Sequence, residues 1–195
     1  RLWNHDEGKA IGLSYFYERG FSEEIIQRFQ LGYSLESWDD LFEAASNAGY
    51  QKEYLGETGL AVIKDDGKAY DRFRSRVIFP IHNISGRPIG FGGRILSEDK
   101  KKPKYVNSPE SEIYHKSDVL YGIYQAKNSI IKLDNCFLVE GYTDVVSLVQ
   151  SGIDNVVASS GTSLTQGQIR LIQRFTPNIT ILYDGDAAGI KASFR

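Results

Sequence analysis

Two acidic residues each follow directly on a short apolar run, an arrangement that can gather carboxylates for metal-dependent chemistry. The run 136–139 ends at Glu140, and the run 179–183 ends at Asp184, with Asp186 two residues further on. Apolar runs without polar alternation are typical of strands buried on both faces of a sheet. Crowded carboxylates repel each other unless a cation lies between them, and Mg²⁺ prefers such oxygen ligands. The sequence therefore predicts a site for Mg²⁺ or Mn²⁺ formed by these acids.

The segments around the two runs predict the elements that would position the acids. Between them we expect, in order, a helix over 143–150, a strand over 155–158 and a helix over 165–175. Thr165 and Gln168 have the spacing of a capping box, which supports a helix start there. The order β-α-β-α-β predicts a parallel sheet with right-handed crossovers. Ligands bind at the carboxyl edge of such sheets, where Glu140, the turn 159–162 and both aspartates should meet.

The chemistry expected at that edge is phosphoryl transfer. An isolated Asp-Gly-Asp sequence is more often a plain turn, and a lone glutamate that ends a strand is usually just solvated. Their position at the same edge of one sheet favours a functional site instead. The helix expected from Ala187 would direct its positive N-terminal dipole at the same place, which favours phosphate.

The basic residues are concentrated in the middle of the chain, although the net charge is only −2. Residues 64–104 carry 11 Lys and Arg against 5 Asp and Glu, whereas residues 1–63 carry 5 against 11 and residues 105–195 carry 7 against 9. A concentrated basic segment predicts contact with phosphate groups that the average charge hides.

Two arginine patterns lie in this basic segment. Arg72, Arg74 and Arg76 alternate, so on a strand all three would point to one face and suit a phosphate backbone. The alternative is an edge strand that its charges protect from pairing. The glycines of the stretch 91–94 would let the backbone approach a ligand closely, with Arg94 as the charged end.

The first 60 residues predict three helices. The first covers 9–19 with Gly20 as its C-cap, the second begins after a cap at Ser22, and the third covers 37–48 from Ser37. The pattern then changes to strands over 61–96, with turns at 65–67 and 84–88, followed by a helix over 117–132. Four aromatic residues of the helical part could stack on nucleic-acid bases, but their helical spacing favours packing in the core. We therefore assign to the core the residues Tyr15, Phe16, Tyr17 and Trp38.

Composition excludes several classes of protein. With 41% hydrophobic residues the chain should fold, and no apolar run approaches the roughly 20 residues of a membrane span. The single cysteine, Cys136, excludes internal disulfides and cysteine-based zinc sites, and a reducing cytoplasmic setting fits. Because the chain opens on Arg1 and has no methionine, we expect a piece of a longer protein.

The acidic stretches resemble the TOPRIM module shared by primases and topoisomerases, and the whole chain resembles bacterial DnaG-type DNA primases. Glu140-Gly141-Tyr142-x-Asp144 and Tyr183-Asp184-Gly185-Asp186-x-Ala188-Gly189 carry the TOPRIM likeness. The upstream likeness lies in 70–76, 79–81, 91–94, 103–110, 115–116, 120–122 and 158–162, in the family's order. Thr143 departs from the family, which has methionine there, but it lies beside the acids and should not affect metal binding.

This resemblance implies a mixed α+β basic subdomain over 1–134 and a TOPRIM-like parallel-sheet subdomain over 135–195, α/β with α+β in fold class. The implied activity is synthesis of short RNA primers on single-stranded DNA from ribonucleoside triphosphates. A replicative helicase is an implied partner, through regions outside this chain. The family has a further acidic motif beyond residue 195, so part of the metal site would be absent and the piece could be inactive.

The resemblance also assigns roles. Asp184 and Asp186 would be metal ligands, and Glu140 would be either a third ligand or the base that helps deprotonate the primer hydroxyl. Phosphate contacts fall to Arg94, Lys104 and Lys116, supported by Asn107, and the loop 100–104 is otherwise solvated. Two other functions stay open, a TOPRIM nuclease or topoisomerase and a single-strand-binding platform without activity.

Overall fold

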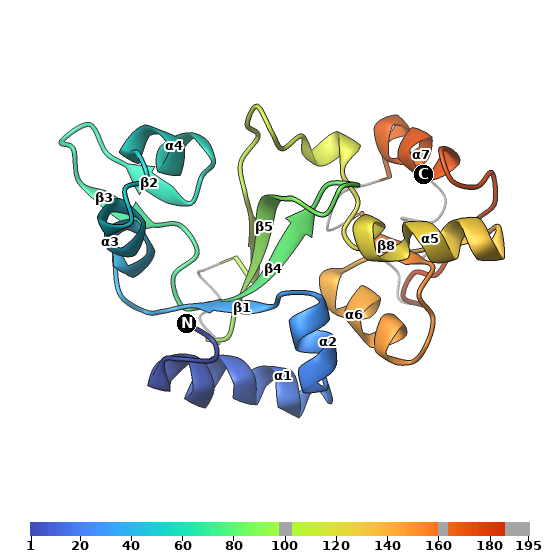
Figure 1. The fold of residues 1–195 in the computed structure, drawn as a ribbon, viewed down its shortest axis with the longest axis horizontal. Helices are drawn as coiled ribbons and strands as arrows, with labels where there is room; N and C mark the ends of the chain where they lie inside the picture. The colour runs from blue at the N-terminus through green and yellow to red at the C-terminus, as the bar shows by residue number, and fades with distance from the viewer. Residues whose placement is uncertain (98–102, 160–163, 186–195) are drawn as a thin grey trace. The chain divides into compact units, whose positions relative to one another are not determined.

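The computed structural model describes residues 1–97, 103–159 and 164–185 (Figure 1). The chain divides into two compact units. Unit 1 comprises Arg1–Pro80 and Gly90–Tyr114, and unit 2 comprises Ile81–Ile89 and the chain from His115 onward. The subdomain boundary expected near residue 134 stays a prediction. Within the described ranges, no helix combines the length and the apolar character that crossing a membrane requires.

Short helices open unit 1, namely the π-helix η1 Gly8–Leu13, α1 Ser14–Glu18, α2 Glu23–Arg28, α3 Asp40–Asn47 and α4 Lys52–Glu57. The predicted helix over 9–19 is confirmed, although its first part has π geometry. Gly20 follows it with φ +76°, the left-handed conformation that ends many helices. The predicted cap of the second helix is also confirmed, because the Ile25 amide donates to Ser22 Oγ at 3.3 Å.

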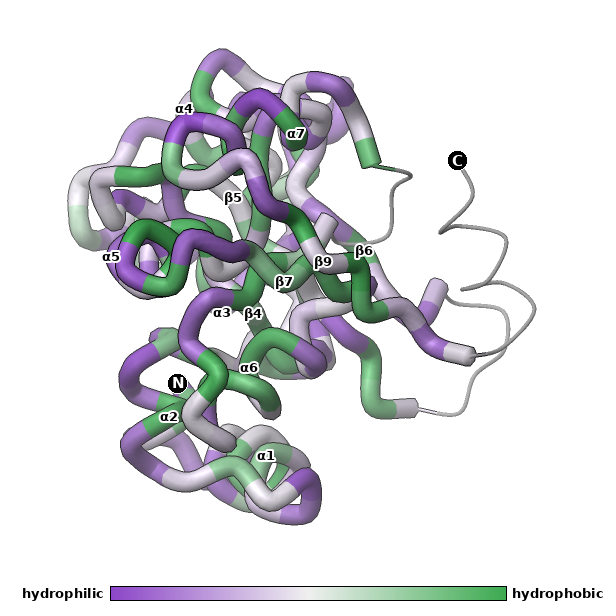
Figure 2. Tube along the Cα trace, turned by 90° about the vertical axis from the view of Figure 1, so that its right-hand side faces the viewer, coloured by the Kyte–Doolittle hydropathy of each residue, from purple (hydrophilic) through white to green (hydrophobic). Residues whose placement is uncertain are grey.

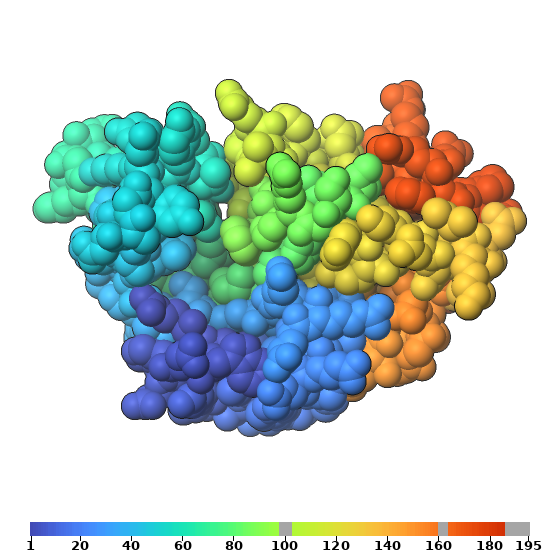
Figure 3. Space-filling model, in the orientation of Figure 1, coloured from blue at the N-terminus to red at the C-terminus, as the bar shows by residue number. Residues whose placement is uncertain are grey.

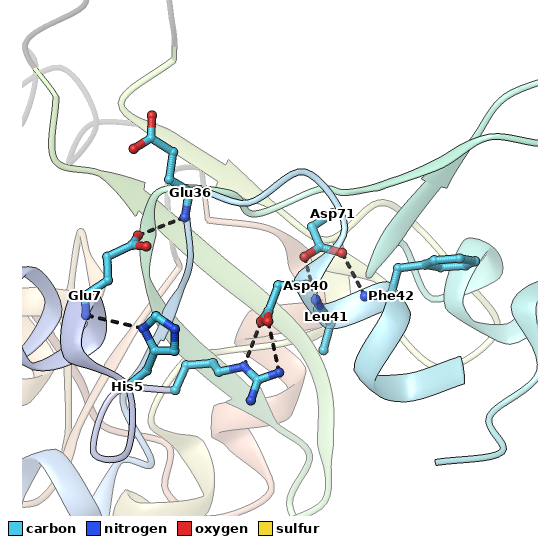
Figure 4. A network of polar contacts seen from close by, with 8 residues as sticks. His5, Glu7, Glu36, Asp40, Leu41, Phe42 and Asp71 are labelled. Atoms are coloured by element: carbon cyan, nitrogen blue, oxygen red, sulfur yellow. Dashed lines mark hydrogen bonds and ion pairs between the residues drawn. The ribbon is translucent and has the colours of Figure 1, made fainter. Parts of the chain in front are cut away.

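The predicted helix start at Ser37 is wrong, because α3 begins at Asp40. The Asp71 carboxylate supplies the acceptors for this helix end, taking hydrogen bonds from the Leu41 amide at 2.7 Å and the Phe42 amide at 2.9 Å (Figure 4). Its negative charge also suits the positive end of the helix. A cap contributed from 30 residues away leaves no local sequence pattern.

Antiparallel pairing dominates unit 1. One sheet has the order β1-β4-β5-β6, from β1 Gly32–Ser34, β4 Arg76–His82, β5 Pro88–Ile95 and β6 Tyr105–Asn107, and a separate pair joins β2 Ala61–Ile63 to β3 Ala69–Asp71. The turn predicted at 65–67 is confirmed, with Gly67 at φ +82°. The turn predicted at 84–88 is confirmed as well, since the Asn83 amide donates to the Arg87 carbonyl at 3.0 Å. Strands β4 and β5 each contribute residues to both units.

The predicted strand through Arg72, Arg74 and Arg76 is wrong, because residues 72–75 form a turn between β3 and β4. Ser75 has φ +55°, and its amide donates to the Leu35 carbonyl at 3.1 Å. A strand cannot continue through a left-handed residue. The three arginines therefore do not form one row on one face.

Unit 2 confirms the predicted β-α-β-α-β order. After the 3₁₀ helix η2 Lys116–Asp118 come α5 Ile123–Leu133, β7 Cys136–Val139, α6 Tyr142–Gln150, β8 Val156–Ala158, α7 Gln166–Gln173 and β9 Ile179–Ile181. The strands are parallel in the order β8-β7-β9. The predicted capping box is present, with the Gln168 amide donating to Thr165 Oγ1 at 3.1 Å and the Thr165 amide donating to Gln168 Oε1 at 3.2 Å.

The helix predicted over 117–132 begins later, at Ile123, because Tyr121 is taken up by strand pairing. Its amide donates to the Ala158 carbonyl at 2.9 Å, and the Ala158 amide returns a bond at 3.0 Å. This bridge fixes the chain in an extended conformation just before the helix. From there α5 packs Ile123, Ala126 and Ile130 into the core of unit 2.

The strands of unit 2 differ in burial. All three residues of β8 are buried, as are Cys136, Leu138 and Val139 of β7, whose hydrophobic character is visible in Figure 2. The expectation that 179–183 is buried on both faces is wrong. Among the described residues β9 lies at the edge of its sheet, and Ile181 and the following Leu182 are 41% and 43% exposed.

The turn between β4 and β5 is held by α5 within unit 2. Lys127 Nζ donates to the Ile84 carbonyl at 2.7 Å. Gly86 has φ +85°, and an added Cβ there would come within 2.6 Å of Tyr124 Cζ. The turn therefore depends on a residue without a side chain, because the tyrosine ring fills the space that a side chain would need.

Candidate metal centre and nucleic-acid interface

Glu140 follows the last residue of β7 and lies at the carboxyl edge of the parallel sheet. The next residue, Gly141, starts α6, and its amide donates to the Asp144 carboxylate at 2.9 Å. An added Cβ on Gly141 would meet that carboxylate at 3.2 Å. Asp144 thus fixes the turn that presents Glu140, although the sequence analysis gave it no role of its own.

Asp184 lies close to Glu140 because the pairing of β9 with β7 continues beyond the last residue of β9. The Leu182 amide donates to the Leu138 carbonyl at 2.8 Å, and two residues later the Asp184 amide donates to Glu140 Oε1 at 3.2 Å. An open hollow of about 320 Å³ lies at this point, lined by Val139, Glu140, Asp144, Ser147, Leu148, Leu182 and Asp184. The predicted meeting of these two acids at one sheet edge is therefore present.

Tyr183 shows that all three strand ends meet at this edge. Burial raises the pKa of the Tyr183 hydroxyl, and the charge of Glu140 raises it further, while a hydrogen bond with Ser159 lowers it. Ser159 follows β8, Glu140 follows β7 and Tyr183 follows β9. The rest of the predicted 159–162 turn lies outside the described residues.

The donor set at this edge fits a hard divalent cation. Glu140 and Asp184 both line the hollow and both carry carboxylate oxygens, and Mg²⁺ commonly binds through one or two protein carboxylates and keeps several waters. Across residues 1–97, 103–159 and 164–185, no group of three or more His, Cys, Asp or Glu side chains has metal-binding proximity. The predicted ligand Asp186 and the helix expected from Ala187 lie outside these ranges.

A cluster of cations and aromatic rings surrounds Arg94 in unit 1. Its guanidinium carbon lies 4.8 Å from the centre of the Tyr15 ring, and that of Arg19 lies 5.1 Å from the same ring. Tyr105, across the strand pair from Arg94, is 38% exposed. Burial raises the pKa of Tyr15, although both arginines lower it. The sequence pattern predicts Tyr15 in the core and gives no role to Arg19, although a position four residues after a tyrosine in a helix indicates a contact between the two side chains.

Arg76 is buried, and it holds the segment that carries Lys104. Its guanidinium donates to the carbonyls of Gly93 at 3.2 Å, Lys104 at 3.2 Å and Pro103 at 3.1 Å. Burial lowers its pKa, but a guanidinium stays protonated. The side chain is 5% exposed, so its contacts are with the backbone of its own unit.

Gly93 is a close-packed position inside unit 1, contrary to the expectation that the glycines of 91–94 let the backbone approach a ligand. An added Cβ there would come within 2.6 Å of Phe73 Cδ1 and 3.0 Å of Arg76 Cδ. The small residue is needed because these two side chains lie directly on the strand. Arg94 is the next residue of β5, and its role as the charged end of the stretch 91–94 stays a prediction.

The other basic residues fall in separate places. Arg74 lies in the 72–75 turn with its guanidinium carbon 3.4 Å from the centre of the Trp38 ring. Arg72 lies in the same turn, with Nε 3.3 Å from the position of a Cβ on Gly59.

Lys104 precedes β6 and Asn107 is its last residue, both in unit 1, whereas Lys116 lies in η2 of unit 2. The Lys116 carbonyl accepts a hydrogen bond from Gln168 Nε2 at 3.2 Å. Among the lysines of the predicted 100–104 loop, only Lys104 is a described residue.

Comparison with known proteins covers nearly the whole chain. The family model of the DNA primase catalytic core, N-terminal domain, matches residues 2–127, and a Toprim-like model matches residues 137–195. The chain is 48% identical over 191 residues to a DNA primase of Halalkalibacterium halodurans and 45% identical over 181 residues to that of Escherichia coli K12. These alignments cover 97% and 93% of this chain but 31% of each relative, so the chain spans about a third of their length.

Solved structures show the same fold. A DNA primase domain from Pseudomonas aeruginosa matches with TM-score 0.90 at 43% identity, covering 99% of this chain and 60% of that one. A DnaG primase catalytic domain bound to single-stranded DNA matches with TM-score 0.85 at 42% identity, covering 98% and 59%. The predicted fold class, a mixed α+β part followed by a parallel Toprim-like sheet, is confirmed.

Proposed function

Because this chain belongs to the DNA primase catalytic core family, we propose that it is the RNA-polymerase part of a primase that makes short RNA primers on single-stranded DNA. Its substrates would be ribonucleoside triphosphates, and its product strand an RNA primer. The observation that carries the proposal is the meeting of Glu140 and Asp184 at one edge of the Toprim-like sheet. A replicative helicase would be engaged by other regions of the longer protein.

We assign the metal site to Glu140, Asp184 and Asp186. Bound there, Mg²⁺ or Mn²⁺ would stabilise the attacking and leaving oxygens as nucleotide joins primer and pyrophosphate departs. Glu140 accepts a hydrogen bond from the Asp184 amide, which orients its carboxylate toward the hollow. Whether Glu140 is a third ligand or the base for the primer hydroxyl stays open, because both roles need the same orientation.

We assign the contacts with DNA and nucleotide phosphates to Arg72, Arg74, Arg94, Lys104 and Lys116, with Asn107 in support. A solved relative with bound single-stranded DNA supports a strand-binding role for this part of the family. Phosphate contacts would position the strand without reading its sequence. Arg76 would act indirectly, because its buried guanidinium holds the backbone at Lys104.

Metal titration of this chain tests the site directly. We expect calorimetry with Mn²⁺ to show binding by wild type and its loss in Asp184→Asn. Glu140→Gln keeps an oxygen that can accept from the Asp184 amide but removes the charge, so it separates orientation from ligation. Wild-type metal affinity in Asp184→Asn would contradict the assignment.

Primer synthesis on a single-stranded template, assayed in the longer protein that carries this sequence, tests the activity. We expect Asp184→Asn to abolish nucleotide incorporation and to leave DNA binding intact. DNA binding that a chelator does not change, without any incorporation by wild type, would indicate a binding platform instead. Cleavage of DNA without incorporation would indicate a Toprim nuclease.

A further inference from the structure

Trp38 is an exposed indole on a segment that is held in place, and the expectation that it belongs to the core is wrong. It is 65% exposed, whereas the neighbouring core position Leu35 is 5% exposed. Exposing a large aromatic side chain forgoes the stabilisation that its burial would provide. A rigidly held exposed aromatic residue is therefore a candidate for contact with a ligand.

Two backbone hydrogen bonds hold this segment on either side of Glu36 and Ser37. The Ser75 amide donates to the Leu35 carbonyl at 3.1 Å, and the Asp71 amide donates to the Trp38 carbonyl at 2.7 Å. The Asp71 carboxylate then caps the helix that follows, as Figure 4 shows. The bend at 36–39 is thus tied to the end of β3 and to the turn before β4.

The side chains around Trp38 form an alternating series of cations and rings within unit 1. The Arg74 guanidinium carbon lies 3.4 Å from the centre of the Trp38 ring. The Tyr70 ring meets Trp38 edge to face, with centres 5.9 Å apart and an interplanar angle of 83°. Lys64 Nζ lies 5.7 Å from the centre of the Tyr70 ring. The Arg74 guanidinium thus covers one face of the Trp38 ring, and the Lys64 ammonium lies over the Tyr70 ring.

We infer that Trp38 and Tyr70, flanked by Arg74 and Lys64, form a stacking platform for unpaired bases of single-stranded DNA. The inference rests on the proposed function and adds to it a base contact outside the Arg94 cluster. Aromatic rings accept any base because every base has a π-face, and flanking cations can reach the phosphates. Figure 3 shows the lobe of residues 40–70, in teal, at the surface.

Charge alone does not explain this platform, because Asp39, Asp65 and Asp66 lie close to it in the sequence. Stacking should therefore dominate the contact with DNA. Trp38 and Lys64 should therefore differ in how they affect the salt dependence of DNA binding. Replacing Trp38 should lower affinity without changing the slope of log affinity against log salt, whereas replacing Lys64 should reduce the slope by about 0.7.

The chain has two tryptophans, so Trp3→Phe makes Trp38 the sole fluorescent indole. In that background we expect an oligothymidylate of about 12 nucleotides, within the usual site sizes for single strands, to quench Trp38 emission and protect it from acrylamide. Trp38→Ala should weaken binding roughly tenfold, in the range expected for one stacked base, and Trp38→Phe should bind nearly as well as wild type.

Tyr50→Ala is the matched control, because Tyr50 is 67% exposed but has no part in this series of rings. Binding of the oligomer, followed by anisotropy, with unquenched Trp38 and unchanged affinity in Trp38→Ala would overturn the platform. The DNA-binding part of the proposed function would stand if Lys104→Ala weakened binding in the same assay. Absence of any oligomer binding by wild type would overturn both.

Discussion

Replacing Arg76 by alanine should loosen the segment that carries Lys104, because one buried guanidinium donates to three backbone carbonyls. Pro103 and Lys104 are exposed, so water can replace the lost donors at their carbonyls. Gly93 is buried, and its carbonyl would lose a charged donor at a cost of about 1–3 kcal/mol. The aliphatic stem packs against the strand at Gly93 and adds about 1 kcal/mol.

Removing a buried cation also relieves its desolvation cost, which offsets part of this loss. We therefore expect Arg76→Ala to lower the free energy of unfolding by about 2–3 kcal/mol in urea denaturation. Arg76→Lys keeps the charge but not the planar fork that reaches three acceptors, so it should fall between alanine and wild type.

The loss of stability in Arg76→Ala should be partly local to the segment around β6 as well as global. Amide hydrogen exchange of β6 should accelerate in Arg76→Ala, whereas the amides of β7 should follow only the change in global stability. Arg87 is exposed, so Arg87→Ala is the control and should change stability by less than about 0.5 kcal/mol. Unchanged stability and unchanged β6 exchange in Arg76→Ala would refute the anchoring argument.

Three further predictions follow from single contacts. Asp71→Ala removes the acceptors for the Leu41 and Phe42 amides and should destabilise the chain by about 2 kcal/mol, measured by urea denaturation; no change would show that water caps α3 equally well. Gly167→Ala places a Cβ 2.8 Å from the Ser117 carbonyl oxygen and should cost about 1–3 kcal/mol in the same assay, with an unchanged midpoint as the contrary result. Burial raises the pKa of the Cys136 thiol to about 12, so an alkylating reagent at about pH 8 should modify it only after unfolding. Because the unfolded thiol ionises first, stability should also fall as the pH rises above about 8.5, and Cys136→Ala should remove the part of this fall that precedes the ionisation of unfolded tyrosines near about pH 10.

Elements whose cause is local could be predicted from the sequence. Ser22 and Thr165 cap helices through residues three positions away, and the apolar run before Glu140 forms a strand that is buried in the sheet. The run before Asp184 also forms a strand, although it is exposed. The approach of these two acids followed from topology, because consecutive parallel strands end at the same edge.

Elements whose cause is distant in the sequence could not be predicted. The start of α3 is set by Asp71, and the start of α5 is delayed by the bridge between Tyr121 and Ala158. The alternation of Arg72 and Arg74 suggested a strand, but backbone bonds to Leu60 and Leu35 fold that stretch into a turn. Local patterns do not record such partners.

The Arg94 cluster and the exposed position of Trp38 have the same origin. Tyr15 and Trp38 carry aromatic side chains of a kind that most often pack in a core, and the only nearby sign to the contrary is Arg19, one helical turn after Tyr15. Their surroundings are arginines from the 72–75 turn and from β5, placed by tertiary structure. Composition showed that the middle segment was basic, but it could not show which rings its arginines would cover.

The division of β4 and β5 between the two units sets an order of events during synthesis on the ribosome. The turn at 84–88 emerges early, but its partner Lys127 and the ring of Tyr124 lie in α5, about 40 residues later in the chain. At ordinary translation rates the turn would wait roughly 2–8 s for that helix. During this interval Gly86 and Ile84 lack the contacts that hold them. A nascent chain paused before residue 123 would thus present an incomplete turn to chaperones and proteases.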